Sequence, residues 1–149
     1  MNTASSTPST PNTTPGAVQV PANLQCFLAI DLGLKRTGLA FGSRMLGSAS
    51  PRPTVRAEGK ARLDGVAAQV REWEPDALVI GVPRHPDGAP HEMTAQAQKF
   101  ARQLQGRFGL PVFEVDERYS TTEAHSQGRG DPDAGAACII LEQFFRSIA

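Results

Sequence analysis

Four acidic residues stand at the ends of the structural elements that this sequence predicts: Asp31, Asp116, Glu117 and Asp133. The first closes an apolar run typical of a buried strand, and the next two close the last strand. The fourth lies in the first turn of the last predicted helix. Because open α/β sheets bind ligands along the edge where their parallel strands end, we expect these carboxylates to converge there.

Carboxylates that converge from separate elements have a well-defined chemistry. Their oxygens are hard ligands that suit Mg²⁺ or Mn²⁺. Two such ions about 4 Å apart activate a water molecule and stabilise the leaving oxygen in phosphodiester cleavage. Without a metal the cluster would repel a phosphate backbone. The sequence therefore predicts a metal-dependent catalytic site built from these four acids.

Three of these acids also have a structural explanation. Asp31, which precedes Gly33, could cap a turn, and Asp133 could stabilise a helix N-terminus. Glu117 could form a surface ion pair with Arg118 or Lys35. The shared placement of the acids at element ends favours the catalytic interpretation.

The basic residues are distributed unevenly. Formal net charge is zero, with 15 basic and 15 acidic residues, which argues against strong non-specific binding of nucleic acid. Residues 31–62, however, contain seven basic residues against two acidic ones, whereas residues 111–149 contain seven acidic against three basic. A basic surface beside an acidic cluster suits a metal site that receives a polyanion. The candidates for binding the substrate are Lys35, Arg36, Arg84 and Arg118.

Other metal chemistry has little support. Cys26 and Cys138 are far apart, and neither has a Cys or His neighbour at the spacing of a zinc site. We interpret both as buried, reduced thiols. His85 and His91 flank an Asp-Gly turn and are expected on the surface of a loop.

Apolar runs predict the strands and apolar stripes predict the helices. The expected strands are residues 26–30, 37–41, 48–55, 77–82 and 112–115. The expected helices are residues 59–73, 93–108 and 132–147, with a short helix starting at a capping box at Ser120. This order predicts an α/β fold with a five-stranded mixed sheet, three antiparallel strands followed by two parallel ones, flanked by helices.

The first residues differ in composition from the rest. Residues 1–22 are mainly Ser, Thr, Pro and Asn without charge, so we expect a disordered tail before a single domain at 23–149. The tail lacks the basic start and apolar run of a secretory signal. No segment has about 18 consecutive apolar residues, and so we expect a cytoplasmic protein that does not enter a membrane.

Four segments, in order along the chain, resemble the motifs of the YqgF/RuvX family. They are FLAIDLGLKRTGLAFG at 27–42, LVIGVPRHPDG at 78–88, KFARQLQGRFGLPVFEVDERYSTTEA at 99–124 and DAGAACIILEQFF at 133–145. The chain departs from the family between Ala124 and Asp133, where family members usually carry a longer segment.

The resemblance implies an RNase H-like fold, a divalent-metal site and a nuclease that matures the 5′ end of 16S rRNA. It assigns the metal site to Asp31, Asp133 and one of the pair Asp116 and Glu117. Glu117 is favoured because a residue just past a strand end is freer to reach the site. Two alternatives stay open: cleavage of branched DNA, as in Holliday junction resolvases, or a non-catalytic RNA-binding factor in ribosome assembly. We expect small-subunit precursors as further partners, and a monomer or weak dimer.

Overall fold

A single mixed sheet organises the molecule. The computed structural model describes residues 19–117 and 132–148, and the side chain of Asp133 lies outside the described part. The strands are β1 (Cys26–Leu32), β2 (Thr37–Ser43), β3 (Ser48–Val55), β4 (Ala77–Pro83) and β5 (Val112–Glu117), in the spatial order β3-β2-β1-β4-β5. β1 pairs antiparallel with β2 and parallel with β4, which pairs parallel with β5. The predicted topology is confirmed.

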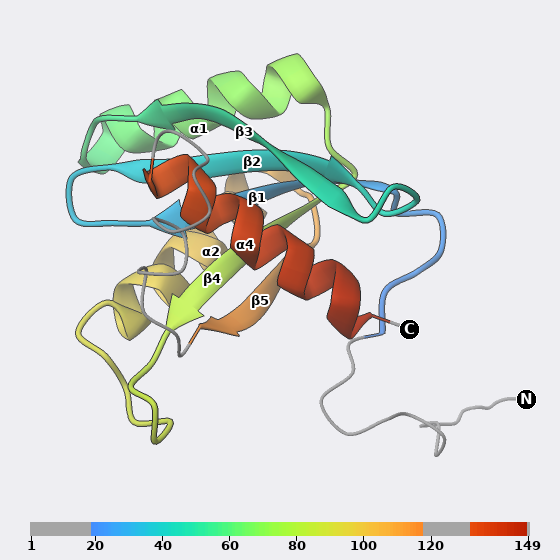
Figure 1. The fold of residues 1–149 in the computed structure, drawn as a ribbon. Helices are drawn as coiled ribbons and strands as arrows, with labels where there is room; N and C mark the ends of the chain where they lie inside the picture. The colour runs from blue at the N-terminus through green and yellow to red at the C-terminus, as the bar shows by residue number, and fades with distance from the viewer. Residues whose placement is uncertain (1–18, 118–131, 149) are drawn as a thin grey trace, which may run out of the picture.

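Helices cover both faces of this sheet (Figure 1). α1 (Gly59–Trp73) and α2 (Thr94–Phe108) lie on one face, and α4 (Pro132–Ser147) crosses the other. Side chains alternate across a strand, so β1 contributes Leu28 and Ile30 to the core under α1 and α2, and Phe27 and Ala29 to the core under α4. Phenylalanine rings pack at tilted angles in the second core, where the centroids of Phe27 and Phe144 lie 5.3 Å apart.

The helix ends follow from local sequence. α2 ends at Gly109, whose φ of 67° is in the left-handed region that a helix C-cap adopts. α1 spans the fifteen residues that its apolar spacing predicts. No helix within residues 19–117 and 132–148 is long and apolar enough to cross a bilayer.

Four strands, β1, β2, β4 and β5, are longer than the sequence predicts, and two of these extensions include candidate acids. β1 and β5 each extend two residues beyond their apolar runs, because Asp31 still pairs with Gly38 and Glu117 still pairs with Pro83. The acids therefore lie within the strands and not after them. The preference for Glu117 assumed that this residue follows the strand, and that assumption is wrong. The face of the sheet on which Glu117 lies decides whether its carboxylate can reach the site.

The folded domain begins earlier than expected. Val20 is buried against the α4 core, although it falls in the segment predicted to be a tail. The guanidinium of Arg44 donates hydrogen bonds to the carbonyl groups of Val20 (3.1 Å) and Pro21 (2.8 Å). Packing and hydrogen bonding thus extend the domain to residue 20. Residues 1–18 lie outside the described part of the chain.

Neither Cys26 nor Cys138 forms a disulfide bond, in agreement with the prediction of reduced thiols. Cys138 is fully buried in α4, whereas Cys26 at the start of β1 is partly exposed. The expectation of burial thus holds for Cys138 alone.

Candidate active site

Asp31 and Glu117 occupy the same face of the sheet. On β1 the residues Phe27 and Ala29 face α4, so the alternation places Asp31 on that face. On β5 the residues Phe113 and Val115 pack toward α4, which places Glu117 there too. β4 lies between the two strands, so their backbones are roughly 10 Å apart. The two carboxylates therefore flank one position of β4.

That position is Gly81. A Cβ atom built there would lie 2.5 Å from Cδ1 of Ile140 on α4 and 3.4 Å from Cγ of Glu117. A side chain at this point would collide with the helix and press on the glutamate. Glycine thus allows α4 to approach the sheet and leaves room for the stem of Glu117. One carboxylate oxygen of that residue, Oε2, is buried.

Asp116 lies on the opposite face. It shares the parity of Val112, which packs against the core under α1 and α2. Its Oδ1 lies 3.9 Å from Nε of Arg84, an ion pair at the surface. The backbone N–H of Arg84 also donates to the carbonyl of Glu117 at 2.9 Å. Arg84, a predicted phosphate-binding residue, is therefore held at the end of β5.

The first turn of α4 carries Asp133. Ile140 lies over Gly81 and Phe144 over Phe27, so α4 runs antiparallel to β1. Its N-terminal turn consequently lies at the edge where β1 and β4 end (Figure 1). The described side chains contain no group of three His, Cys, Asp or Glu residues arranged for a metal ion. The third predicted ligand, the carboxylate of Asp133, is outside that set.

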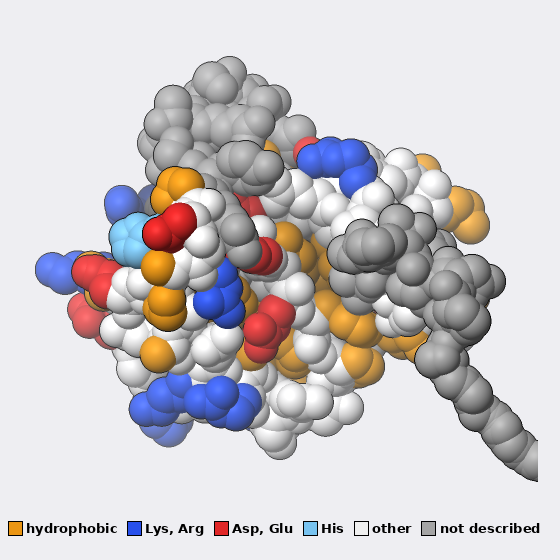
Figure 2. All heavy atoms as spheres, turned by 90° about the horizontal axis from the view of Figure 1, so that it is seen from below, with side chains coloured by type: hydrophobic (Ala, Val, Ile, Leu, Met, Phe, Trp, Pro, Cys, Tyr) orange, Lys and Arg blue, Asp and Glu red, His pale blue; other side chains and the backbone are white. Residues whose placement is uncertain are grey.

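Figure 2 shows acidic side chains gathered on the face seen from below, close to basic and hydrophobic ones. Lys35 and Arg36 are exposed in the turn between β1 and β2, next to Asp31 in sequence. Arg118 and the capping box at Ser120 lie outside the described residues.

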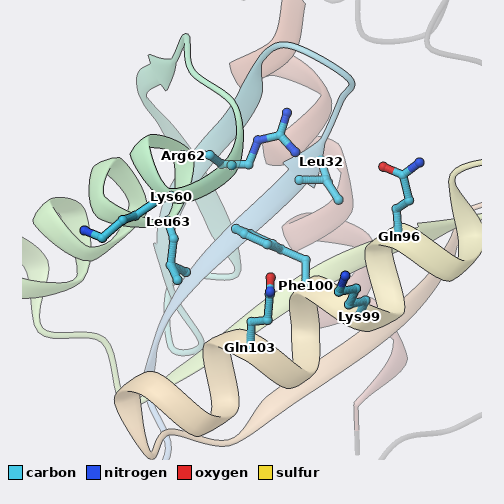
Figure 3. Close-up of a pocket in the computed structure, with 9 residues that line it drawn as sticks. Leu32, Lys60, Arg62, Leu63, Gln96, Lys99, Phe100 and Gln103 are labelled. Carbon is cyan, nitrogen blue, oxygen red and sulfur yellow. The ribbon is translucent and has the colours of Figure 1, made fainter.

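A separate cleft of about 680 Å³ lies between α1 and α2 on the other face of the sheet (Figure 3). Its lining includes Leu32, Arg62, Lys99 and Phe100, and none of its lining residues is acidic. The cleft therefore offers no carboxylate ligand to a metal ion. Lys60 at its edge pairs with Asp64 at 3.1 Å.

Arg62 is a residue whose role the sequence did not reveal. It is only 8 % exposed, although it was counted among the surface charges. Its Nη2 donates to the carbonyl groups of Gly33 and Leu34, and its Nε to that of Ala57. Burial lowers the pKa of Arg62, and the Glu58 carboxylate opposes this effect. Its spacing from Val66 and Val70, on the apolar stripe of α1, is the signal that indicates a buried position.

Comparison with known proteins identifies the family. The model of the RuvX family, described as Holliday junction resolvase, matches residues 25–147. The chain belongs to the RuvX family. The resemblance predicted from its motifs is confirmed.

Curated relatives and solved structures agree with this assignment. A protein of Albidiferax ferrireducens named "Putative pre-16S rRNA nuclease" is 67% identical over 131 residues, covering 88% of this chain and 84% of its own. One of Polaromonas sp. with the same name is 61% identical, covering 85% and 92%. RuvC of T. thermophilus in complex with a Holliday junction substrate has a TM-score of 0.54 at 16% identity, covering 82% of this chain and 94% of its own. The structural likeness to RuvC confirms the expected RNase H-like fold. The two relatives are named as nucleases, which is the class of enzyme that the sequence predicts.

Proposed function

We propose that this RuvX protein is a divalent-metal-dependent nuclease that processes the 5′ end of pre-16S rRNA. The observation that supports it best is the placement of Asp31 and Glu117 on one face of the sheet, on either side of Gly81. The names of the relatives supply the substrate class.

The carboxylates fit a hard divalent ion, because both Asp31 and Glu117 offer oxygen donors from a rigid sheet. In this proposal they bind Mg²⁺ or Mn²⁺ together with Asp133. A divalent ion bound there would lower the pKa of water and stabilise charge on the phosphate. Lys35, Arg36, Arg84 and Arg118 would hold neighbouring phosphates of the substrate.

Branched DNA is the second candidate substrate, because the family model is described as Holliday junction resolvase. The test is cleavage of two substrates by the full chain, a pre-16S RNA fragment and a four-way DNA junction, with Mg²⁺, Mn²⁺ or EDTA. We expect RNA to be cut at the precursor boundary only with metal, and Asp31→Asn to lose about 100-fold or more of the rate.

Each outcome selects one function. Cleavage of the junction alone supports the resolvase. RNA binding without cleavage, unchanged by Asp31→Asn, supports a non-catalytic assembly factor. RNA cleavage in EDTA would contradict the metal requirement. We further propose that the protein acts in the cytoplasm on small-subunit precursors, as a monomer or weak dimer.

A further inference from the structure

Large apolar side chains are exposed at both ends of β2. Leu34 is 66% exposed in the turn before this strand, whereas Met45 and Leu46 are exposed in the turn after it, Leu46 at 76%. The two turns lie at opposite ends of the sheet. Only the turn of Leu34 adjoins Asp31, and a chain of three residues spans at most about 11 Å.

The backbone of Leu34 is held in place. Nη2 of the buried Arg62 donates to its carbonyl at 2.5 Å and to that of Gly33 at 2.8 Å. Within the turn, the N–H of Gly33 donates to the carbonyl of Arg36 at 2.8 Å. Figure 3 shows Arg62 reaching from α1 toward this turn. A buried guanidinium therefore fixes a turn whose tip is an exposed leucine.

Gly33 is needed for this geometry. A Cβ atom there would lie 2.7 Å from the carbonyl oxygen of Arg36. An open surface hollow of about 430 Å³ is lined by residues 33–36. Lys35 and Arg36 follow the leucine and are exposed. An apolar tip with cations beside it matches a surface that holds a phosphate backbone while contacting a base.

From these contacts we propose that Leu34 is a wedge that enters between two bases of the RNA beside the scissile phosphate. This inference rests on the proposed nuclease function and adds how the substrate is distorted. Apolar side chains inserted at a base step unstack it, and adjacent cations neutralise the backbone. Leu34 is three residues from Asp31, so the wedge would act within a few nucleotides of the site at Asp31.

Fluorescence of 2-aminopurine tests the wedge without cleavage. The probe is a pre-16S RNA hairpin with 2-aminopurine placed in turn at each nucleotide flanking the precursor boundary, mixed with the full Asp31→Asn chain. We expect the fluorescence to rise when 2-aminopurine is at one or two adjacent positions. Adding Leu34→Ala should reduce that rise about fivefold or more, with the dissociation constant changed less than about threefold.

Two further variants serve as controls. Leu46→Ala removes a leucine that is at least as exposed, at the other end of β2, and should leave the rise in fluorescence unchanged. Leu34→Phe supplies another apolar wedge and should retain it. The inference is overturned by an absent rise, by a rise that Leu34→Ala leaves intact, by an equal loss with Leu46→Ala, or by loss of binding with Leu34→Ala.

The two proposals fail separately. RNA cleavage by the unsubstituted chain with no fluorescence rise in the Asp31→Asn chain would remove the wedge and leave the nuclease. A rise that depends on Leu34, with no cleavage in Mg²⁺ or Mn²⁺, would remove the nuclease and leave the wedge.

Discussion

At the scale of single residues, neighbours in the sequence have opposite environments. Asp116 and Glu117 are adjacent, yet the first pairs with Arg84 at the surface and the second lies beside Gly81 under α4. The residue types alone predict the acidic set. They do not assign a face, because the face depends on how far the pairing of β5 with β4 continues.

This difference predicts unequal effects on catalysis. Glu117→Gln should lower the rate of RNA cleavage about 100-fold or more, since it removes a carboxylate on the same face of the sheet as Asp31. Asp116→Asn keeps the size of the side chain and should cost less than about tenfold. Steady-state rates with Mg²⁺ measure both, and a larger effect at Asp116 would assign the site to the other face.

Gly81 is the second test at this scale. Gly81→Ala should destabilise the fold by about 1–3 kcal/mol, because its Cβ collides with Ile140 on the packed helix. Gly106→Ala is the matched control, since nothing lies within 4 Å of its Cβ, and in a helix it should be neutral or stabilise by about 1 kcal/mol. Urea denaturation compares the two. Equal stabilities would mean that α4 moves away from β4 readily.

At the scale of elements, the start of β1 is fixed by a residue that precedes β4. Oδ2 of Asp76 accepts hydrogen bonds from the backbone N–H groups of Gln25 (2.8 Å) and Cys26 (2.9 Å). These two hydrogen bonds hold the pKa of Asp76 below its ordinary value, and the bond from Cys26 has the larger effect. Desolvation of the carboxylate opposes them. The carboxylate sets where the two parallel strands begin.

The sign of its pH dependence follows. A carboxyl group whose pKa is lower in the folded protein stabilises it fully above the unfolded value of about 3.8, and this contribution is lost as pH falls through the folded pKa. Asp76→Ala should cost about 1–2 kcal/mol at pH 7. The difference should shrink below about pH 4. Denaturation at pH 7 and pH 3 checks this, and a gap that widens in acid would contradict it.

Most element bounds could be predicted from the sequence because apolar spacing records which residues a helix or strand buries. Helix α1 matches its predicted bounds. The acidic ends of β1 and β5 could not be predicted, since they are polar and belong to strands only through partners far along the chain. The burial of Arg62 could not be predicted for a related reason. A charged side chain is expected at the surface, whereas this one is buried through hydrogen bonds to backbone carbonyl groups.

At the scale of the whole molecule, two cores hold the sheet between its helices. The core under α4 contains an aromatic group in which the ring of Phe144 lies near those of Phe27 and Phe113, at 5.3 and 5.5 Å between centroids. It joins the last helix to both the first and the last strand of the chain.

Removing that ring should weaken the entire fold. Phe144→Ala is expected to cost about 3–5 kcal/mol, as for other buried phenylalanines. Phe108→Ala, at the partly buried end of α2, should cost less. Thermal unfolding ranks the two variants, and a smaller loss at Phe144 would show that α4 is held mainly by other contacts.

Because Cys26 and Cys138 differ in burial, their reactivities can be used to measure local opening of the fold. An alkylating reagent should reach Cys26 in the native state but Cys138 only when the terminal helix lifts from the sheet. The labelling rate of Cys138 in the folded chain, divided by its rate in the urea-unfolded chain and followed by mass spectrometry, would then give the equilibrium constant for that opening without any engineered probe. If bound nucleic acid holds α4 against the sheet, it should slow the labelling of Cys138 and leave the labelling rate of Cys26 unchanged.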